Sequence, residues 1–415
     1  MSRRRRPKTD ARAPGGPIAA GAGGWKSQWP KTVRAAYNNL ETGRNDLAIP
    51  FKTRSLAAFV MAAGVLASCG SGGEESSANK ANSNNDGAGW REILTGVGGQ
   101  MVGAEHDVLF YAFDTLAYPN EPVDLTARLQ SAKNFKSLKG ATIGFYQGEE
   151  ETGAAETGDD GYARISWTPP KAGDYEFTVR ITKPPEDDDY SDAVKVTPAQ
   201  LLVAARAKKA ELAIVDLDHT VVDSSFWRVL MGGAKPMAGS ADVMHKLAKR
   251  YTIVYLTHRP DILTRKSKSW LIDNGYPRAP LMVSELKDAI GDSGKFKTAR
   301  LKAIRESYPN VRIGIGDKLS DAQAYVDNGI KAYLIPYYKN KPKDMQKTAD
   351  AIRQLKGRGN LQVVSGWTEV EAGIFRRKTF APNTFASRLD AEARRMLAEE
   401  RREKDRKDKE EEEDD

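Results

Sequence analysis

Two kinds of hydrophobic periodicity divide the chain. Between residues 90 and 183, apolar and polar residues alternate in segments such as "VDLTARL" and "YEFTVRI". A period of two is typical of strands that bury one face. Clusters of Gly, Asp and Pro, such as "TGDDG" and "TPPKAGD", separate these segments and predict turns. We therefore expect an all-β, immunoglobulin-like sandwich over residues 90–183. It contains no catalytic constellation, so we interpret it as a spacer or as a docking module for an unknown protein partner.

The pattern changes between residues 195 and 372. Continuous apolar runs such as "LAIVDL", "YTIVYLT", "APLMVS", "VRIGIGD" and "KAYLIP" alternate with helical segments such as "ADVMHKLAKR". Strands buried on both faces and joined by helices form parallel sheets, which bind ligands at the carboxyl ends of their strands. This part is expected to be a Rossmann-like α/β domain. The acidic, proline-containing segment 183–193 predicts a hinge before it, and residues 373–415 a charged helical or disordered tail.

The N-terminal part contains a short apolar run that ends at a cysteine. Residues 51–69 pass from basic residues through an apolar run to Leu-Ala-Ser-Cys, which is the order of a secretory signal. The run is shorter than the ~20 residues that span a bilayer. "LASC" resembles the lipobox of bacterial lipoproteins, which implies lipidation of Cys69, the chain's single cysteine. The polar residues 70–89 then predict a flexible tether.

Two alternatives to this leader stay open. Residues 51–69 are also consistent with a short buried helix that carries an incidental Cys69. A signal is expected at the N-terminus, so we interpret residues 1–50 as a leader of doubtful translation, with the true start near residue 47. The expected location is the bacterial cell envelope, with membrane attachment through the lipid; a cytoplasmic protein is the alternative.

Length and charge add little. The 415 residues allow two or three domains plus tails. The net charge is +8, but basic and acidic runs are segregated, so nucleic acid is an unlikely partner.

The ends of the apolar runs carry the candidate chemistry. In chain order the residues are Asp216, Asp218, Thr220, Thr257, Arg259, Lys295, Lys297, Asp317 and Asp321. Carboxylates this close together repel one another, so a cation is expected between them. Mg²⁺ prefers oxygen ligands and is the obvious candidate. A strand-end aspartate is also a common helix cap, an explanation we would accept for Asp321 alone.

This series resembles the haloacid-dehalogenase-like (HAD) phosphatase superfamily over roughly residues 205 to 370. The resemblance implies that Asp216 is the nucleophile and Asp218 the general acid/base. It further implies that Thr257 donates a hydrogen bond to the phosphoryl group and that Lys297 neutralises charge. Lys295 remains a competitor for the role of Lys297.

The resemblance also implies a magnesium site and residues that position phosphate. The implied metal residues are Asp216, Asp218, Asp317 and Asp321. Thr220 and Arg259 would position the phosphate. The segments on either side of Thr257 are too short for a lid domain, so the site is expected to be uncapped and open to a bulky or surface-bound phosphate.

Finer similarity points to one group of phosphatases. "DLDHTVVDSS", "YLTHRPD" and "GIGDKLSDAQAYVDNGI" look like the catalytic domain of lipin-type phosphatidate phosphatases. The chain departs from that pattern with His219 in place of a glycine and without an obvious amphipathic membrane helix. Four cations, Arg259, Arg265, Lys266 and Lys268, could face anionic headgroups, although a solvated helix face explains them equally well.

Three functions are therefore open. The first is a Mg²⁺-dependent, membrane-tethered phosphatase for phosphatidate-like lipids. The second is the same chemistry on another phosphomonoester or a nucleic-acid end. The third is a non-catalytic surface lipoprotein.

Overall fold

The computed structural model describes residues 102–230, 232–289 and 292–413. These residues all belong to one compact unit. The predicted leader, signal, lipidated Cys69 and tether lie outside the described residues. Within the described part of the chain, no helix is both long and apolar enough to cross a membrane.

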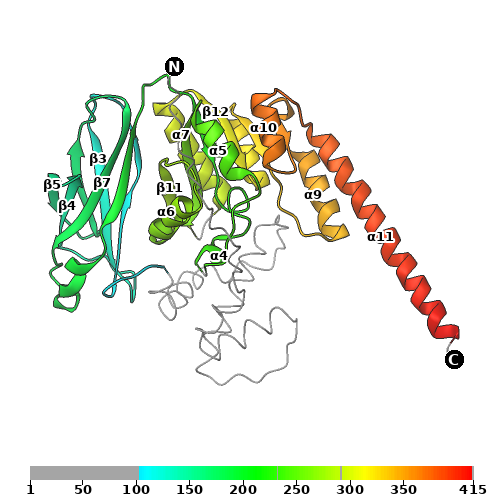
Figure 1. Ribbon diagram of the computed structural model, residues 1–415, viewed down its shortest axis with the longest axis horizontal. Coiled ribbons are helices and arrows are strands. Elements are labelled where there is room, and N and C mark those ends of the chain that lie inside the picture. Colours follow the sequence, from blue (N-terminus) through cyan, green and yellow to red (C-terminus); the bar gives the residue numbers. More distant parts are fainter. Residues whose placement is uncertain (1–101, 231, 290–291, 414–415) are drawn as a thin grey trace, which may run out of the picture. The chain divides into compact units, whose positions relative to one another are not determined.

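The first part of the fold is a β-sandwich, as its alternating pattern predicts (Figure 1). One sheet has the order β1-β3-β6, with strands β1 (Val108–Phe113), β3 (Val123–Ser131) and β6 (Tyr162–Trp167). The other has the order β2-β8-β7-β4-β5, with strands β2 (Thr115–Ala117), β8 (Ala199–Ala205), β7 (Gly173–Lys183), β4 (Thr142–Gln147) and β5 (Glu150–Glu156). Phe110, Leu129, Phe145 and Phe177 belong to one buried apolar cluster that forms its core.

The sandwich extends past the predicted boundary at residue 183. The predicted hinge is a 3₁₀ helix, Asp188–Lys195, whose Tyr190 and Ala193 are buried in the sandwich core. Strand β8 then pairs with β7 and β2. Its sequence "AQLLVAA" lacks alternation because both faces are buried, so the pattern of half-buried strands could not identify it.

The second part is a parallel six-stranded sheet with helices on both faces, which confirms the predicted α/β organisation. Its order is β11-β10-β9-β12-β13-β14. The strands are β9 (Leu212–Val215), β10 (Thr252–Pro260), β11 (Leu281–Ser284), β12 (Val311–Gly316), β13 (Lys331–Leu334) and β14 (Leu361–Val363). The three-residue β14 is too short to show a pattern, and the sequence did not predict it.

Alternate residues of the central strand β9 face two separate apolar cores. Ala213 and Val215 pack on one side, and Leu212 and Ile214 on the other. The first core includes residues of α5 (Ser240–Ala248), α6 (Thr264–Asp273) and α10 (Trp367–Phe375). The second includes residues of α7 (Ser293–Ser307), α8 (Leu319–Asp327), α9 (Pro342–Gln354) and α11 (Pro382–Glu413). The short α4 (Phe226–Leu230) precedes α5.

The C-terminal boundary also differs from the prediction. Helix α11 falls within the predicted tail, yet Phe385, Ala386, Leu389 and Ala393 are buried in the second core. These apolar residues recur at helical spacing before the charged run begins. The first turns of α11 are thus part of the α/β domain.

Candidate active site

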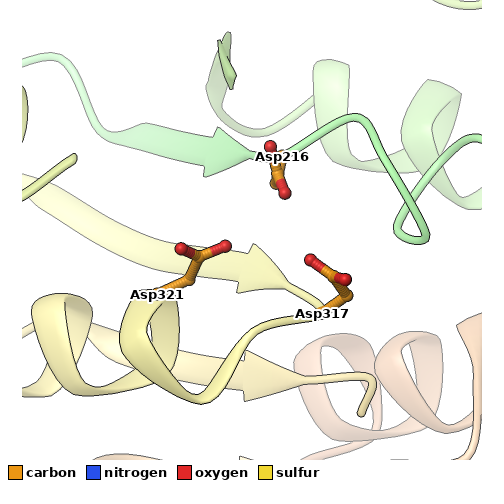
Figure 2. Close-up of side chains that lie close together, drawn as sticks. All are labelled: Asp216, Asp317 and Asp321. Atoms are coloured by element: carbon orange, nitrogen blue, oxygen red, sulfur yellow. The ribbon is translucent and has the colours of Figure 1, made fainter. Parts of the chain in front are cut away.

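Three aspartates meet at the carboxyl edge of the parallel sheet. Asp216 follows β9, Asp317 follows β12, and Asp321 lies in the first turn of α8 (Figure 2). All three are buried, and one oxygen of each lies within 4.8 Å of the others. Gly316 makes room for this approach, because a Cβ atom there would lie 3.0 Å from Asp321 Oδ2.

Lys297 brings a positive charge into this cluster. Its side chain is 1% exposed, and its Nζ lies 2.5 Å from Asp321 Oδ2 and 3.0 Å from Asp216 Oδ2. Asp292 caps α7 by accepting a hydrogen bond from the Lys295 backbone N–H, while the Lys295 side chain is exposed. The structure thus places Lys297, rather than Lys295, among the carboxylates.

The cluster carries more negative than positive charge. Burial alone would lower the pKa of the Lys297 ammonium group, but Asp216 and Asp321 beside it raise that pKa well above its ordinary value. Burial and the neighbouring Asp216 raise the pKa of Asp317 well above the ordinary carboxyl range. Burial also raises the pKa of Asp321, against the effect of Lys297. One ammonium group does not compensate three buried carboxylates.

The donor set fits a divalent cation. Among the described residues, Asp317 Oδ1 and Asp321 Oδ1 are buried side-chain atoms without a hydrogen-bond partner. Buried oxygens without partners are costly, and a metal ion would satisfy them. An all-oxygen set with few carboxylates suits Mg²⁺. Asp216, Asp317 and Asp321 are the residues that would hold it.

Asp218 takes a different place from the one predicted for a metal residue. Among the described residues, the three-aspartate cluster does not include it. Both of its carboxylate oxygens accept hydrogen bonds from Arg259, at 2.7 Å from Nη2 and 3.1 Å from Nε. Arg259 is buried, and its Nη1 donates to Ser267 Oγ at 2.9 Å. In this structure Arg259 therefore holds Asp218, although it was expected to position phosphate.

The two predicted threonines are buried at the same edge. Thr257 Oγ1 accepts a hydrogen bond of 3.3 Å from the Arg259 backbone N–H. Thr220 Oγ1 has no side-chain hydrogen-bond partner among the described residues, while the Thr220 carbonyl accepts a bond from Trp367 Nε1. The Thr220 hydroxyl thus remains available at the strand end.

His219 is a non-glycine residue in the left-handed region, with φ of 51°. Histidine tolerates this region better than most residues, which accounts for its place where the resemblance led us to expect glycine. Its ring stacks on Tyr337 with centroids 3.9 Å apart. Tyr337 was not predicted from the sequence, although it follows the end of β13, where parallel strands place ligand-binding residues.

Arg265 and Lys268 are engaged in contacts within the protein. Lys268 Nζ forms an ion pair with Asp114 at 2.6 Å and donates to the carbonyls of Ala112 and Gln200. Arg265 donates to the Thr197 carbonyl and pairs with Glu105. Both cations link α6 to the sandwich, so the structure does not present them as a headgroup surface.

Comparison with known proteins gives one family match. A family model described as "PITM 1-3, LNS2 domain" matches residues 213–338. This segment runs from β9 past β13 and carries the catalytic and metal residues predicted for the site. No curated protein matches the chain.

Solved structures give partial matches at low similarity. One belongs to the Pnkp1/Rnl/Hen1 RNA repair complex, at 15% identity and a TM-score of 0.28, covering 32% of this chain and 45% of that one. Another is the CARDB domain of a Pyrococcus furiosus protein, at 12% identity and a TM-score of 0.18, covering 24% of this chain and 94% of that one. A third is the D0-D1 domain of intimin, at 15% identity and a TM-score of 0.17, covering 24% of this chain and 46% of that one. This chain spans less than half of the RNA repair and intimin chains. The match on residues 213–338 is consistent with the resemblance of this segment to lipin-type phosphatases, and it supports a phosphatase-type hydrolase.

Proposed function

We propose that the protein is a Mg²⁺-dependent phosphoric monoester hydrolase of the HAD type that acts through an aspartyl-phosphate on Asp216. The observation that carries the proposal is the cluster of Asp216, Asp317 and Asp321 around Lys297, with two carboxylate oxygens lacking partners. A divalent cation bound there would offset charge on the phosphoryl oxygens. In this proposal the α/β domain is an uncapped HAD-like fold and the sandwich is immunoglobulin-like.

The residues divide the chemistry between them. An oxygen of Asp216 attacks phosphorus in line, and the bond from phosphorus to the leaving oxygen breaks. Asp218 protonates the leaving alkoxide and later takes a proton from the water that hydrolyses the aspartyl-phosphate. Arg259 makes one hydrogen bond to each oxygen of Asp218, which leaves a lone pair on each oxygen for the proton that Asp218 transfers. Lys297 offsets charge, and Thr220 and Thr257 offer hydroxyls to the phosphate.

The substrate class we favour is a phosphatidate-like lipid phosphate at a membrane. Resemblance of "DLDHTVVDSS" and "YLTHRPD" to lipin-type phosphatases supports it. In the described residues of the connection from β9 to β10, the helices are the short α4 and α5, which leaves little chain for a lid. Lipidation of Cys69 would bring the site close to the headgroups.

A substrate panel tests the activity. We expect hydrolysis of an aryl phosphate that depends on Mg²⁺, and higher kcat/KM for phosphatidate than for soluble monoesters or nucleic-acid 3′ or 5′ phosphates. Preference for a soluble ester would support the proposed phosphatase reaction but contradict the proposed lipid substrate. No turnover of any phosphate would favour a non-catalytic surface lipoprotein.

Cys69→Ser tests the anchor separately. Turnover of a soluble phosphate should be unchanged, while the protein should leave the membrane fraction and hydrolyse bilayer-borne substrate more slowly. If the variant still fractionates with membranes, or if the native N-terminus is intact at Met1, the lipoprotein hypothesis is wrong and a cytoplasmic enzyme is the better account.

A further inference from the structure

A buried aspartate outside the three-aspartate cluster, Asp261, directly follows strand β10. Asp261 has no exposed surface, and four donor groups lie within hydrogen-bond distance of its carboxylate. Oδ1 accepts from the backbone N–H groups of Ile262 at 3.0 Å and Leu286 at 3.1 Å. Oδ2 lies 2.6 Å from Arg128 Nη1 and 3.1 Å from the Tyr111 hydroxyl. This carboxylate, unlike those of the metal cluster, is fully satisfied.

The side chains that bind Asp261 come from the β-sandwich. Tyr111 lies on β1, and its hydroxyl is also 2.6 Å from Gln130 Oε1. Arg128 lies on β3, with its guanidinium group 4.6 Å from the centre of the Tyr162 ring. The backbone amides that complete the set belong to the α/β domain. Asp261 is therefore the point where sandwich side chains enter the phosphatase domain.

Apolar packing surrounds this point. Leu109, Tyr111 and Phe135 of the sandwich share one buried cluster with Ile262 and Leu263, which follow Asp261 in the chain. Water is therefore largely excluded from the Arg128–Asp261 pair. A buried ion pair is stable only if its geometry is good. Removal of one partner leaves the other charge buried without compensation, which is strongly destabilising.

The same segment carries two residues of the active site. We call residues 257–263 the β10 end; Thr257 and Arg259 lie at its start and Asp261 lies near its close. Ser284 Oγ is within hydrogen-bond distance of the carbonyls of His258 and Arg259, at 3.2 and 3.3 Å. Ser284 thus fixes the backbone at His258 and Arg259, and the partners of Asp261 fix it two residues later. Arg259, which binds Asp218, lies on this fixed backbone.

We propose that Arg128 and Tyr111 of the β-sandwich are positioning residues for the active site, which act through Asp261 to fix the β10 end and thereby the grip of Arg259 on Asp218. The inference rests on the proposed phosphatase function. It gives the sandwich a part in catalysis, in place of the spacer or docking role that its sequence suggested.

The chain offers a matched control. Asp114, next to β1, is a buried carboxylate that pairs with Lys268 of α6 and accepts backbone N–H groups from Leu202 and Leu281. This pair also joins the sandwich to the α/β domain, but its hydrogen bonds go to Ala112, Gln200, Leu202 and Leu281 and not to the β10 end. Arg128→Met and Lys268→Met therefore each remove one cation from a buried interdomain ion pair, and only the first acts on Asp261.

The experiment compares these variants in the full chain. For Arg128→Met we expect kcat for an aryl phosphate to fall about 10-fold or more, since a misplacement of about 1 Å in a site costs up to about 100-fold. KM should change little. The loss should grow with poorer leaving groups, because Arg259 orients the carboxylate that protonates them. Lys268→Met should lower the unfolding temperature but not kcat, and Arg128→Lys should recover part of the loss.

Hydrogen exchange supplies a readout that does not need activity. Amides of residues 257–263, except Pro260, and of Leu286 should lose protection in Arg128→Met and keep it in Lys268→Met. If Arg128→Met does not fold, Arg128→Lys provides the same test with a smaller expected loss. Protection retained at the β10 end, or wild-type kcat despite lost protection, would overturn the inference. A wild-type protein without phosphatase activity would reject the proposed function, while the exchange data would still decide whether Arg128 fixes the β10 end.

Discussion

The buried carboxylates of this protein occur in two regions that differ in their hydrogen-bond and charge partners. At the sheet edge, three aspartates lie together, Lys297 pairs with only two of them, and two carboxylate oxygens have no partner among the described residues. At the sandwich contact, Asp261 pairs with Arg128 and Asp114 pairs with Lys268, and both carboxylates also accept backbone N–H groups. Both regions are buried, so burial alone does not distinguish them.

The difference lies in charge balance. A one-to-one ion pair with its hydrogen bonds satisfied is complete within the protein. A buried cluster with excess negative charge is neutralised only when it binds a cation, a proton or both. Excess buried charge is thus the better indicator of a functional site than the number of acidic residues.

The largest expected effect comes from removing the nucleophile. Asp216→Asn should lower turnover of an aryl phosphate roughly 10⁴-fold or more, because the amide cannot form the acyl phosphate. Circular dichroism should show an intact fold. Without metal, this variant should unfold at a higher temperature than the wild type, since it removes excess negative charge, whereas Asp114→Asn should unfold at a lower one. Substantial turnover with unchanged metal dependence would rule out Asp216 as the nucleophile.

Removal of the shared cation should cost stability as well as activity. Lys297→Ala leaves three buried carboxylates without an ammonium group, so we expect a loss of about 3–5 kcal/mol in the free energy of unfolding. Denaturant titration measures it. The control, Lys295→Ala, removes an exposed side chain and should change stability and activity little. If Lys295→Ala proves the more damaging substitution, the roles of the two lysines are reversed.

Metal binding should stabilise the folded protein. With Mg²⁺ at a hundred times its dissociation constant, linkage predicts about 2.7 kcal/mol, visible as a rise in unfolding temperature. Asp317→Ala should abolish that rise. Asp218→Asn should keep the rise, because Arg259 and not the cluster holds Asp218. If this variant loses the rise, Asp218 belongs to the metal site.

Ca²⁺ should support turnover poorly, since its larger, looser shell suits in-line transfer less well.

The smallest expected effect is a pH slope in the metal-free protein. Burial and Asp216 raise the pKa of Asp317 above its ordinary value of 3.8. The folded state therefore binds more protons than the unfolded state between the two pKa values, so stability should fall as pH rises through that interval. Denaturation in a chelator at several pH values measures this slope. Asp317→Asn should flatten it, and an unchanged slope would assign the proton to another group.

The sequence predicted those features that depend on local pattern. Period-two segments identified the sandwich, and continuous apolar runs identified five of the six parallel strands. Strand ends pointed to Asp216, Asp317 and Asp321, because parallel strands bring their carboxyl ends to one edge. The choice between the two lysines of "KFK" required the structure, because the geometry of helix α7 places Lys297 inside the cluster and Lys295 outside it.

What escaped prediction depends on contacts between distant segments. Asp261 looks like an ordinary turn residue, and nothing near it in sequence announces Arg128, which is 133 positions away. The hold of Arg259 on Asp218 and the stack of His219 on Tyr337 likewise join separate strand ends. Strand β8 was missed because burial on both faces removes the alternation that marks a sandwich strand.

The place of β8 has a consequence for synthesis on the ribosome. This strand lies between β2 and β7, so the larger sheet of the sandwich stays split until residues 199–205 have emerged. Strand β9, at the centre of the catalytic sheet, begins at Leu212, soon after β8 ends at Ala205. Because domains generally fold as units from the N-terminus during translation, the sandwich closes just as the first catalytic strand appears. The nascent phosphatase domain then assembles against a finished surface that already presents Tyr111 and Arg128.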